Sequence, residues 1–452
     1  MNTLQAGFAR VNINPMLGIG VRGYYIPRFA KGFLDDLEAS ALALTCGQTP
    51  VLLVNIDHCG IEADICNRFR GAMSKTSGIP VENILLTATH THTGPMLRPI
   101  DRYVVDENLL AEYVDFLERR LCDLAVLALA NRKPARMGMA VAHAPDRIAY
   151  IRRYRMKDGT TQTCPPINDP NIDHPLGELD QRINILRFDI EGENSVVILN
   201  YGLHGDTVGG ELISSDWQGW TRRTVEKALD GTRCMCVNGA EGDVGSTHVF
   251  PSGGDMNDTE ISFDNEMKSP GMARFVGRAL AGSVLQVYDK VEYVDVDRVC
   301  MMHRVVTVDA KKPDPDAMPL AREYKRLHDA GRDDLIPYEG MQLTTVLAEA
   351  LRLCRMENSP ETFDLELTGL RIGNVAFVGI PGEPFTQIGV AIKNFEGWDM
   401  ILPCCLANGN EGYFPTQKAY DEGGYETNSS VYAAGVGEKI IAGAGMLLND
   451  MR

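Results

Sequence analysis

Two histidines at the end of an apolar run constrain this chain more than any other feature. Residues 89–95 read THTHTGP and closely follow the apolar residues 84–86. In an extended chain His90 and His92 point to the same side, so two imidazoles project together where a strand gives way to a Gly-Pro turn. Such a pair is typical of metal ligands, although the polar face of a half-buried strand explains an isolated His-x-His equally well.

A third histidine follows another strand-like run. The stretch 196–203 is mostly apolar and leads directly to His204, which precedes a glycine. Taken alone, His204 is better explained as a hydrogen-bonded turn residue. The chain has nine histidines in 452 residues, so three of them at strand ends before Gly-containing turns are hard to attribute to chance.

Strand-like and helical patterns alternate along the chain, which predicts an α/β fold built as one layered unit. Strands are predicted at 7–13, 42–46, 50–57 and 196–203, with two more between 363 and 380. Helices are predicted over 107–131, from 215 to about 229 and over 319–330, with capping-box spacing at Ser215. Because no repeat or clear linker divides the sequence, residues 1–452 are expected to form a single domain.

The charge and composition of the chain indicate which kinds of partner it can bind and in which cellular compartment it is expected. The chain has 44 Lys and Arg residues against 61 Asp and Glu residues, a net charge of −17. Nucleic acid is therefore not an expected partner, because phosphate binding requires a basic face. The sequence shows no secretory leader pattern, no run near the roughly 18 apolar residues of a membrane span, and irregularly spaced cysteines. These features predict a cytoplasmic protein without an integral membrane segment.

Two further segments contain candidate ligands. Glu383 stands in a Pro/Gly turn directly after the predicted strand that ends at residue 380. A glutamate in such a turn is usually just solvated. Tyr413 and Tyr425 lie in a Gly- and Tyr-rich region, which an aromatic-packed surface loop also explains.

Taken in order, these segments resemble one known family. The motifs are HTHTGP at 90–95, LHG at 203–205, LISSD at 212–216, NGAEGDV at 238–244, PGE at 381–383, and GY at 412–413 with YE at 425–426. Their order is similar to that in the neutral/alkaline non-lysosomal ceramidase family. The resemblance covers most of the chain, from about residue 9 to residue 425. It implies an α/β catalytic domain of layered mixed β-sheets flanked by helices.

The resemblance also implies roles for individual residues. The side chains that match the zinc ligands of the family are His90, His204, Glu383 and Tyr413. The side chains that match its other catalytic residues are His92, Arg152 and Tyr425, with Arg153 as the neighbouring alternative to Arg152. One zinc ion is therefore the expected cofactor.

The segment after Asp243 departs from that family. Its ceramidases carry a nucleophilic serine directly after the Gly-Asp-Val equivalent, where this chain has Gly245, with Ser246 one place later. We therefore predict metal-activated water in place of a serine nucleophile. The sequence also shows neither a secretory signal nor the C-terminal immunoglobulin-like domain of the family, which favours a small polar substrate over ceramide.

The leading prediction is a zinc-dependent hydrolase of an N-acyl (amide) or related bond in a small polar molecule. Zinc with two imidazoles, a carboxylate and a phenolate can accept a fifth ligand, lower the pKa of water to about 7 and polarise a carbonyl. His92 can exchange protons near neutral pH, and Arg152 or Tyr425 can stabilise an oxyanion. The alternatives are a metal-dependent lyase or isomerase acting on a polar, sugar-like substrate, and a binding protein without catalysis.

Two aspartates are predicted to support the site without binding the metal. Asp57 ends a predicted strand, and Asp243 sits in a Gly-containing turn. Carboxylates of this kind commonly fix the tautomer of a metal-binding imidazole. A turn or helix-cap hydrogen bond explains both residues about as well.

Overall fold

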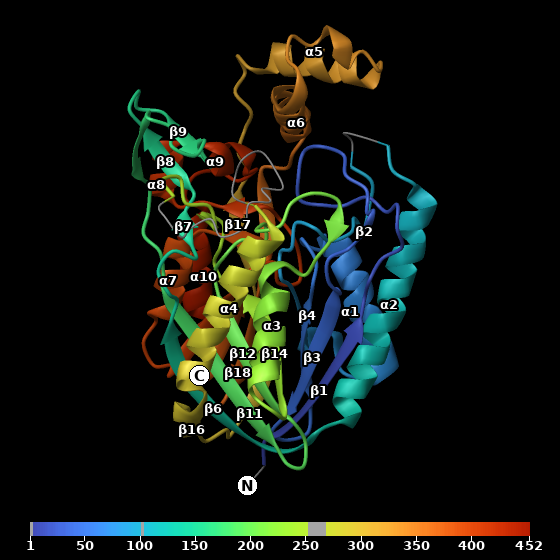
Figure 1. Cartoon of the computed structure of the whole chain (residues 1–452), viewed down its shortest axis with the longest axis vertical. Helices are drawn as coiled ribbons and strands as arrows, with labels where there is room; N and C mark the ends of the chain where they lie inside the picture. Colours follow the sequence, from blue (N-terminus) through green and yellow to red (C-terminus); the bar gives the residue numbers. More distant parts are fainter. Residues whose placement is uncertain (1–2, 101–103, 252–267) are drawn as a thin grey trace.

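The computed structural model describes residues 3–100, 104–251 and 268–452. Two β-sheets pack face to face, and helices cover their outer faces (Figure 1). This is the layered α/β architecture predicted from the sequence.

Within the described residues, nine strands form the larger sheet. Its order is β14 (Thr232–Asn238), β12 (Ser195–Tyr201), β11 (Arg182–Ile190), β6 (Lys133–His143), β1 (Gln5–Asn12), β3 (Glu38–Thr45), β4 (Val51–Ile56) and β5 (Ile84–Ala88), with β16 (Glu292–Val294) beside β6. The β12–β14 and β4–β5 pairs are parallel. The two ends of this order meet, because the Asn55 amide donates to the Cys236 carbonyl at 2.8 Å and the Asn238 amide donates to the Thr89 carbonyl at 3.1 Å.

Four strands form the second sheet in the part of the chain that the structure describes. They are β17 (Val299–Asp309), β18 (Thr362–Ile372), β19 (Val375–Gly379) and β21 (Met400–Cys404), in that order. Apolar side chains from both sheets, among them Leu42, Phe188 and Phe377, fill the layer between them. The Asn200 amide also donates to the Pro403 carbonyl at 2.9 Å, which fixes β12 against β21.

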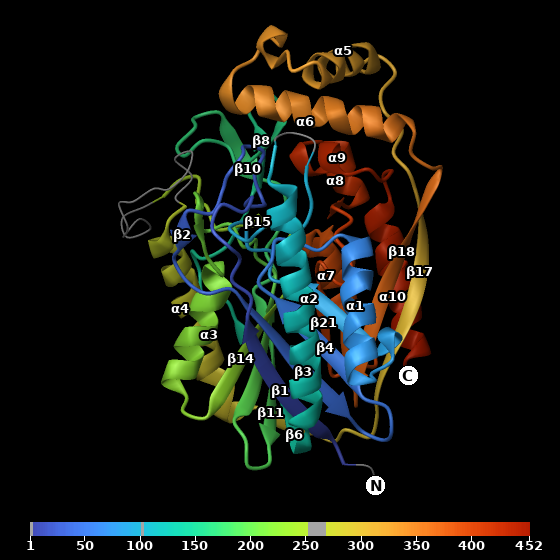
Figure 2. The same cartoon turned by 90° about the vertical axis from the view of Figure 1, so that its right-hand side faces the viewer.

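Three pairs of helices cover the sheets. Figure 2 shows α1 (Ala63–Ser77) and α2 (Glu107–Ala130) side by side over β1, β3 and β4. The helices α3 (Asp216–Ala228) and α4 (Pro270–Val287) cover β11, β12 and β14, and α7 (Thr386–Lys393) and α10 (Val436–Asp450) cover the second sheet. No helix in the described ranges is long and apolar enough to cross a membrane.

Most predicted elements are present within a few residues. The helix predicted over 107–131 is α2, and the Asp106 side chain caps it by accepting from the Asn108 and Leu109 N–H groups. The capping box expected at Ser215 is wrong. The Ser215 hydroxyl instead donates to Asp35 at 2.7 Å, and α3 begins at Asp216 with a positive φ of 55°.

A helical hairpin projects from one end of the layers. It consists of α5 (Met318–Asp329), close to the helix predicted over 319–330, and α6 (Gly340–Glu357), which the sequence analysis missed. The two helices share a small core of their own, and α6 runs across the top of the molecule in Figure 2. Arg352 on α6 donates to Ser429 at the end of α9 (Tyr425–Ser429) at 3.3 Å, so the hairpin contacts the short helix that begins with Tyr425.

Candidate metal centre

The turns that carry the three histidines are joined to each other. Thr91 forms a parallel bridge with Gly205, and the His92 N–H donates to the Gly205 carbonyl at 2.7 Å. A Cβ atom at Gly205 would lie 2.6 Å from the His90 carbonyl oxygen, so this approach requires glycine. His90 itself has a positive φ of 71°, a conformation that costs free energy and is concentrated at functional sites.

A second junction places Glu383 beside Tyr413. The two-residue strands β20 (Glu383–Pro384) and β22 (Tyr413–Phe414) pair in parallel, with Glu383 opposite Tyr413. The Gly242 N–H donates to the Pro384 carbonyl at 2.9 Å, and a Cβ atom at Gly242 would lie 2.5 Å from the Glu383 carbonyl oxygen. Glycine at position 242 therefore lets the 238–244 segment pack directly against the Glu383 turn.

The two junctions bring a carboxylate between two imidazoles. The Oε2 atom of Glu383 lies 3.4 Å from Nε2 of His90 and 3.5 Å from Nε2 of His204. All three side chains are buried, and Oε2 has no hydrogen-bond partner among the described residues. These three groups are close enough together to hold one metal ion.

Hydrogen bonds on the far side of each ring fix the tautomers. Nδ1 of His90 lies 2.6 Å from the Cys59 carbonyl, and Nδ1 of His204 lies 2.9 Å from the Glu241 carbonyl. Because a carbonyl only accepts, both Nδ1 atoms carry a proton, and both Nε2 atoms lie on the Glu383 side of their rings. Imidazole nitrogens and a carboxylate oxygen are ligands that zinc prefers, so these residues fit that ion.

Burial and neighbouring charges shift the pKa values of Glu383, His90 and His204. Burial opposes charge on Glu383, but His90 and His204 hold the pKa of its carboxyl well below the usual range. Burial likewise opposes protonation of His90, while the Glu383 carboxylate raises the pKa of that imidazole well above its usual range. Burial and the charge of Arg152 lower the pKa of His204 to about 4. His204 is therefore neutral at pH 7.

Arg152, and not Arg153, reaches this group. Its Nη1 lies 2.9 Å from Nε2 of His204, its Nη2 donates to the Tyr413 hydroxyl at 3.0 Å, and its Nε donates to the buried Glu426 at 2.8 Å. Arg153 points elsewhere, donating to Glu422 at 3.1 Å and to the Gly423 carbonyl at 2.7 Å. The guanidinium of Arg152 thus lies against two of the four predicted ligands.

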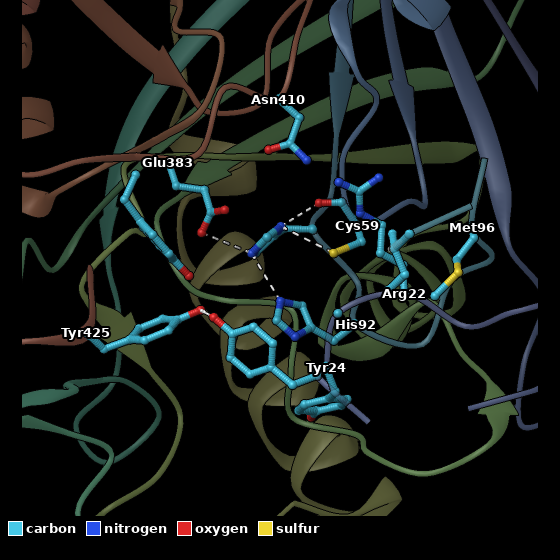
Figure 3. Close-up of a pocket in the computed structure, with 13 residues that line it drawn as sticks. Arg22, Tyr24, Cys59, His92, Met96, Glu383, Asn410 and Tyr425 are labelled. Carbon is cyan, nitrogen blue, oxygen red and sulfur yellow. Dashed lines mark hydrogen bonds and ion pairs between the residues drawn. The ribbon is translucent and has the colours of Figure 1, made fainter. Parts of the chain in front are cut away.

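A cavity of about 220 Å³ opens beside these side chains (Figure 3). Five predicted site residues line it: His90, His92, Glu383, Tyr413 and Tyr425. Nε2 of His92 lies 3.1 Å from Nε2 of His90, and burial together with the neighbouring imidazole lowers the pKa of His92 well below its usual range. The Tyr425 hydroxyl accepts from Tyr25 at 2.8 Å.

Of three comparisons with known proteins, only the comparison with solved structures gives matches. No protein-family model and no curated protein sequence matches this chain. Among solved structures, the neutral ceramidase of Pseudomonas aeruginosa matches all of this chain and 75% of its own, with a TM-score of 0.72 at 18% identity. A structure described as ceramidase complexed with C2 matches all of this chain and 76% of its own, with a TM-score of 0.73 at 17% identity.

The chain has the fold of the neutral ceramidases. This confirms the predicted fold class and the resemblance on which the site residues were assigned. Five of the predicted site residues line one cavity, and His204 and Arg152 lie against them without lining it.

The prediction that Asp57 orients an imidazole is wrong. Its carboxylate pairs with Arg222, with oxygen–nitrogen distances of 2.8 and 2.5 Å, and it accepts from the Glu38 N–H at 2.8 Å. Asp57 therefore neutralises a buried arginine. Asp243 is better described by the helix-cap alternative, because it accepts from the N–H and hydroxyl of Thr386 at the start of α7, both at 2.7 Å.

Ser246 is buried but does not line the cavity. It follows β15 (Val244–Gly245), which pairs with β7 (Tyr150–Ile151) just before Arg152. The choice between a serine nucleophile and metal-activated water remains a prediction.

Three residues beside the centre were not predicted from the sequence: Arg22, Cys59 and Glu241. Glu241 is fully buried, its Oε2 lies 3.5 Å from Nδ1 of His204, and both carboxyl oxygens lack a hydrogen-bond partner in the described part of the chain. Cys59 lines the cavity with its sulfur 4.0 Å from Nδ1 of His90. Position after a buried strand was an available signal for Cys59, which follows β4, but nothing in the sequence marks Glu241 as buried.

Proposed function

We propose that this protein is a zinc-dependent hydrolase of an N-acyl bond in a small polar molecule. One observation carries the proposal. Two buried imidazoles, each with Nδ1 tied to a backbone carbonyl, direct Nε2 at an unpartnered oxygen of Glu383. A buried carboxylate without a partner is costly unless a cation accompanies it. Tyr413 lies next to Glu383 in the paired strands and supplies the fourth ligand.

When bound, zinc polarises a carbonyl and lowers the pKa of water, so one ion supports both partners of an amide hydrolysis. Side chains of the protein transfer the protons and stabilise the developing charge. His92 lines the cavity within 3.1 Å of a ligand nitrogen, where it takes the proton released by the attacking water and delivers it to the leaving amine. Its T-shaped contact with Tyr24, with ring centroids 5.5 Å apart, holds the imidazole in place.

Arg152 and Tyr425 stabilise the negative charge that develops on the carbonyl oxygen. The Glu426 carboxylate accepts from Nε of Arg152 at 2.8 Å, and the Tyr25 hydroxyl donates to Tyr425 at 2.8 Å, so a neighbouring side chain positions each group. The part of the substrate that enters the cavity is small, since the cavity measures about 220 Å³. This size and the polar lining favour a small polar substrate.

The test is metal analysis combined with a substrate screen. Purified protein is expected to contain one zinc per chain and to cleave a member of a panel of amides, esters and sugar derivatives, with product masses that sum to substrate plus water. A product mass equal to the substrate, or lower by one water, would instead identify the isomerase or lyase alternative. Stoichiometric zinc without turnover of any compound would identify a binding protein.

A further inference from the structure

One cationic side chain in the cavity is not used by the proposed chemistry. Arg22 follows Val21, which bridges to Pro95, and its N–H donates to the Gly94 carbonyl at 2.9 Å. These contacts fasten Arg22 to the turn that carries His90 and His92. Figure 3 shows its guanidinium on the same side of the cavity as Cys59 and Asn410.

The Arg22 side chain lines the cavity and has more hydrogen-bond donors than its printed partner uses. A guanidinium has five N–H donors in a planar fork. Among the described residues, the Arg22 side chain hydrogen-bonds one group, Glu62, through Nη1. Its remaining donors are on a side chain that is 23% exposed and lines the cavity. Glu62 therefore fixes Arg22 in place and leaves an edge of the fork for a ligand.

Asn410 adds a second polar group at this end of the cavity. Its side chain is held close to the backbone, since a Cβ atom at Gly60 would lie 2.5 Å from Nδ2 of Asn410. An amide on the same side of the cavity as a planar cationic fork matches a carboxylate, which accepts several hydrogen bonds in one plane. A long acyl chain offers no hydrogen-bond acceptor to either group.

On this basis, and resting on the proposed hydrolase function, we propose that the substrate carries a carboxylate which Arg22 and Asn410 bind next to the scissile bond. The substrate class is thus an N-acylated amino acid. Figure 3 shows Glu383 across the cavity from Arg22, and His90 and His92 line the same cavity, so a small molecule with its carboxylate on Arg22 can present its amide to these side chains.

Two matched probes test whether the protein recognises the carboxylate of a ligand. The binding probes are N-methylsulfonylglycine and N-methylsulfonylethanolamine, which resist hydrolysis and differ in carboxylate against hydroxymethyl, titrated into zinc-loaded protein by ligand-observed NMR. The wild type is expected to bind the carboxylate probe roughly 10- to 100-fold more tightly, as for one charge-assisted contact. Arg22→Met should abolish this preference. Arg22→Gln provides a second variant, and either one that retains a folded spectrum decides the outcome.

Arg98→Met is the control variant. Arg98 also pairs with Glu62, at 3.9 Å, but it does not line the cavity, so the preference should survive its removal. Equal affinity of the wild type for both probes, or a preference that survives removal of Arg22, would overturn the inference.

Hydrolysis of N-acetylglycine and N-acetylethanolamine separates this inference from the proposed function. Equal cleavage of both compounds would refute the carboxylate site and leave the hydrolase standing. An Arg22-dependent binding preference without cleavage of any amide would support the site and refute the hydrolase.

Discussion

Replacing Glu241 by glutamine should change how the stability of this protein depends on pH. Burial raises the pKa of the Glu241 carboxyl from 4.5 to about 8, with Glu383 adding repulsion and His90 opposing it. Between these two values the folded protein holds a proton that the unfolded chain releases. The free energy of unfolding therefore falls as pH rises across this window, by about 1.4 kcal/mol per pH unit. Glutamine mimics the neutral acid and removes this slope.

The expected difference is measurable as a melting temperature. Over two pH units, from 5.5 to 7.5, the wild type loses about 2.5 kcal/mol relative to Glu241→Gln. With an unfolding entropy of about 2.1 cal/mol/K per residue, a chain of 452 residues melts about 1 °C lower for each kcal/mol. The variant should therefore gain about 2.5 °C on the wild type between these pH values.

The assay is differential scanning fluorimetry in EDTA, so that no metal ion contributes to the melting temperature. Glu361→Gln is the control, since Glu361 is 87% exposed and lies on the surface beside Lys312. If the gap between wild type and Glu241→Gln stays constant over this range, Glu241 ionises as an ordinary glutamate and the argument from burial fails.

Three further substitutions test the centre. Glu383→Gln should weaken zinc binding at least about 100-fold in a chelator competition, and unchanged affinity would remove Glu383 from the ligand set. His92→Ala should lower kcat about 10²- to 10⁴-fold while zinc content stays near wild type, whereas Ser246→Ala should keep most activity; a covalent acyl group trapped on Ser246 would contradict this. Asp57→Asn should cost about 3 kcal/mol of stability, because the buried Arg222 loses its two-point carboxylate partner and keeps only Glu38 at 3.4 Å, and metal content should not change.

Local patterns predicted the parts of this structure that depend on nearby sequence. The strand ends that carry His90 and His204 follow from apolar runs that stop before a glycine, and the α2 helix follows from its apolar spacing. Tyr413 needed the family resemblance, because its position depends on a two-residue pairing with Glu383 that no periodicity reveals.

The missed features all depend on contacts between distant segments. Asp57 ends a strand as a supporting carboxylate would, but its partner Arg222 comes from a helix 165 positions away. Glu241 and Arg22 are acidic and basic residues that composition assigns to the surface. Only the packing of the second sheet and of the loop before α1 encloses them.

The two glycine contacts that join the ligand-bearing turns have a consequence for the order of assembly. His90 belongs to the first quarter of the sequence and Tyr413 to the last tenth, and the close approaches at Gly205 and Gly242 form only when the segments between them have folded. Bringing such distant segments together carries a loop-closure cost that only completed tertiary structure offsets. With the proposed ligands, a chain emerging from the ribosome lacks the full set until Tyr413 has been made. Metal loading would then be a late event that follows folding of this domain, and a cation that binds only the folded state would stabilise it by mass action.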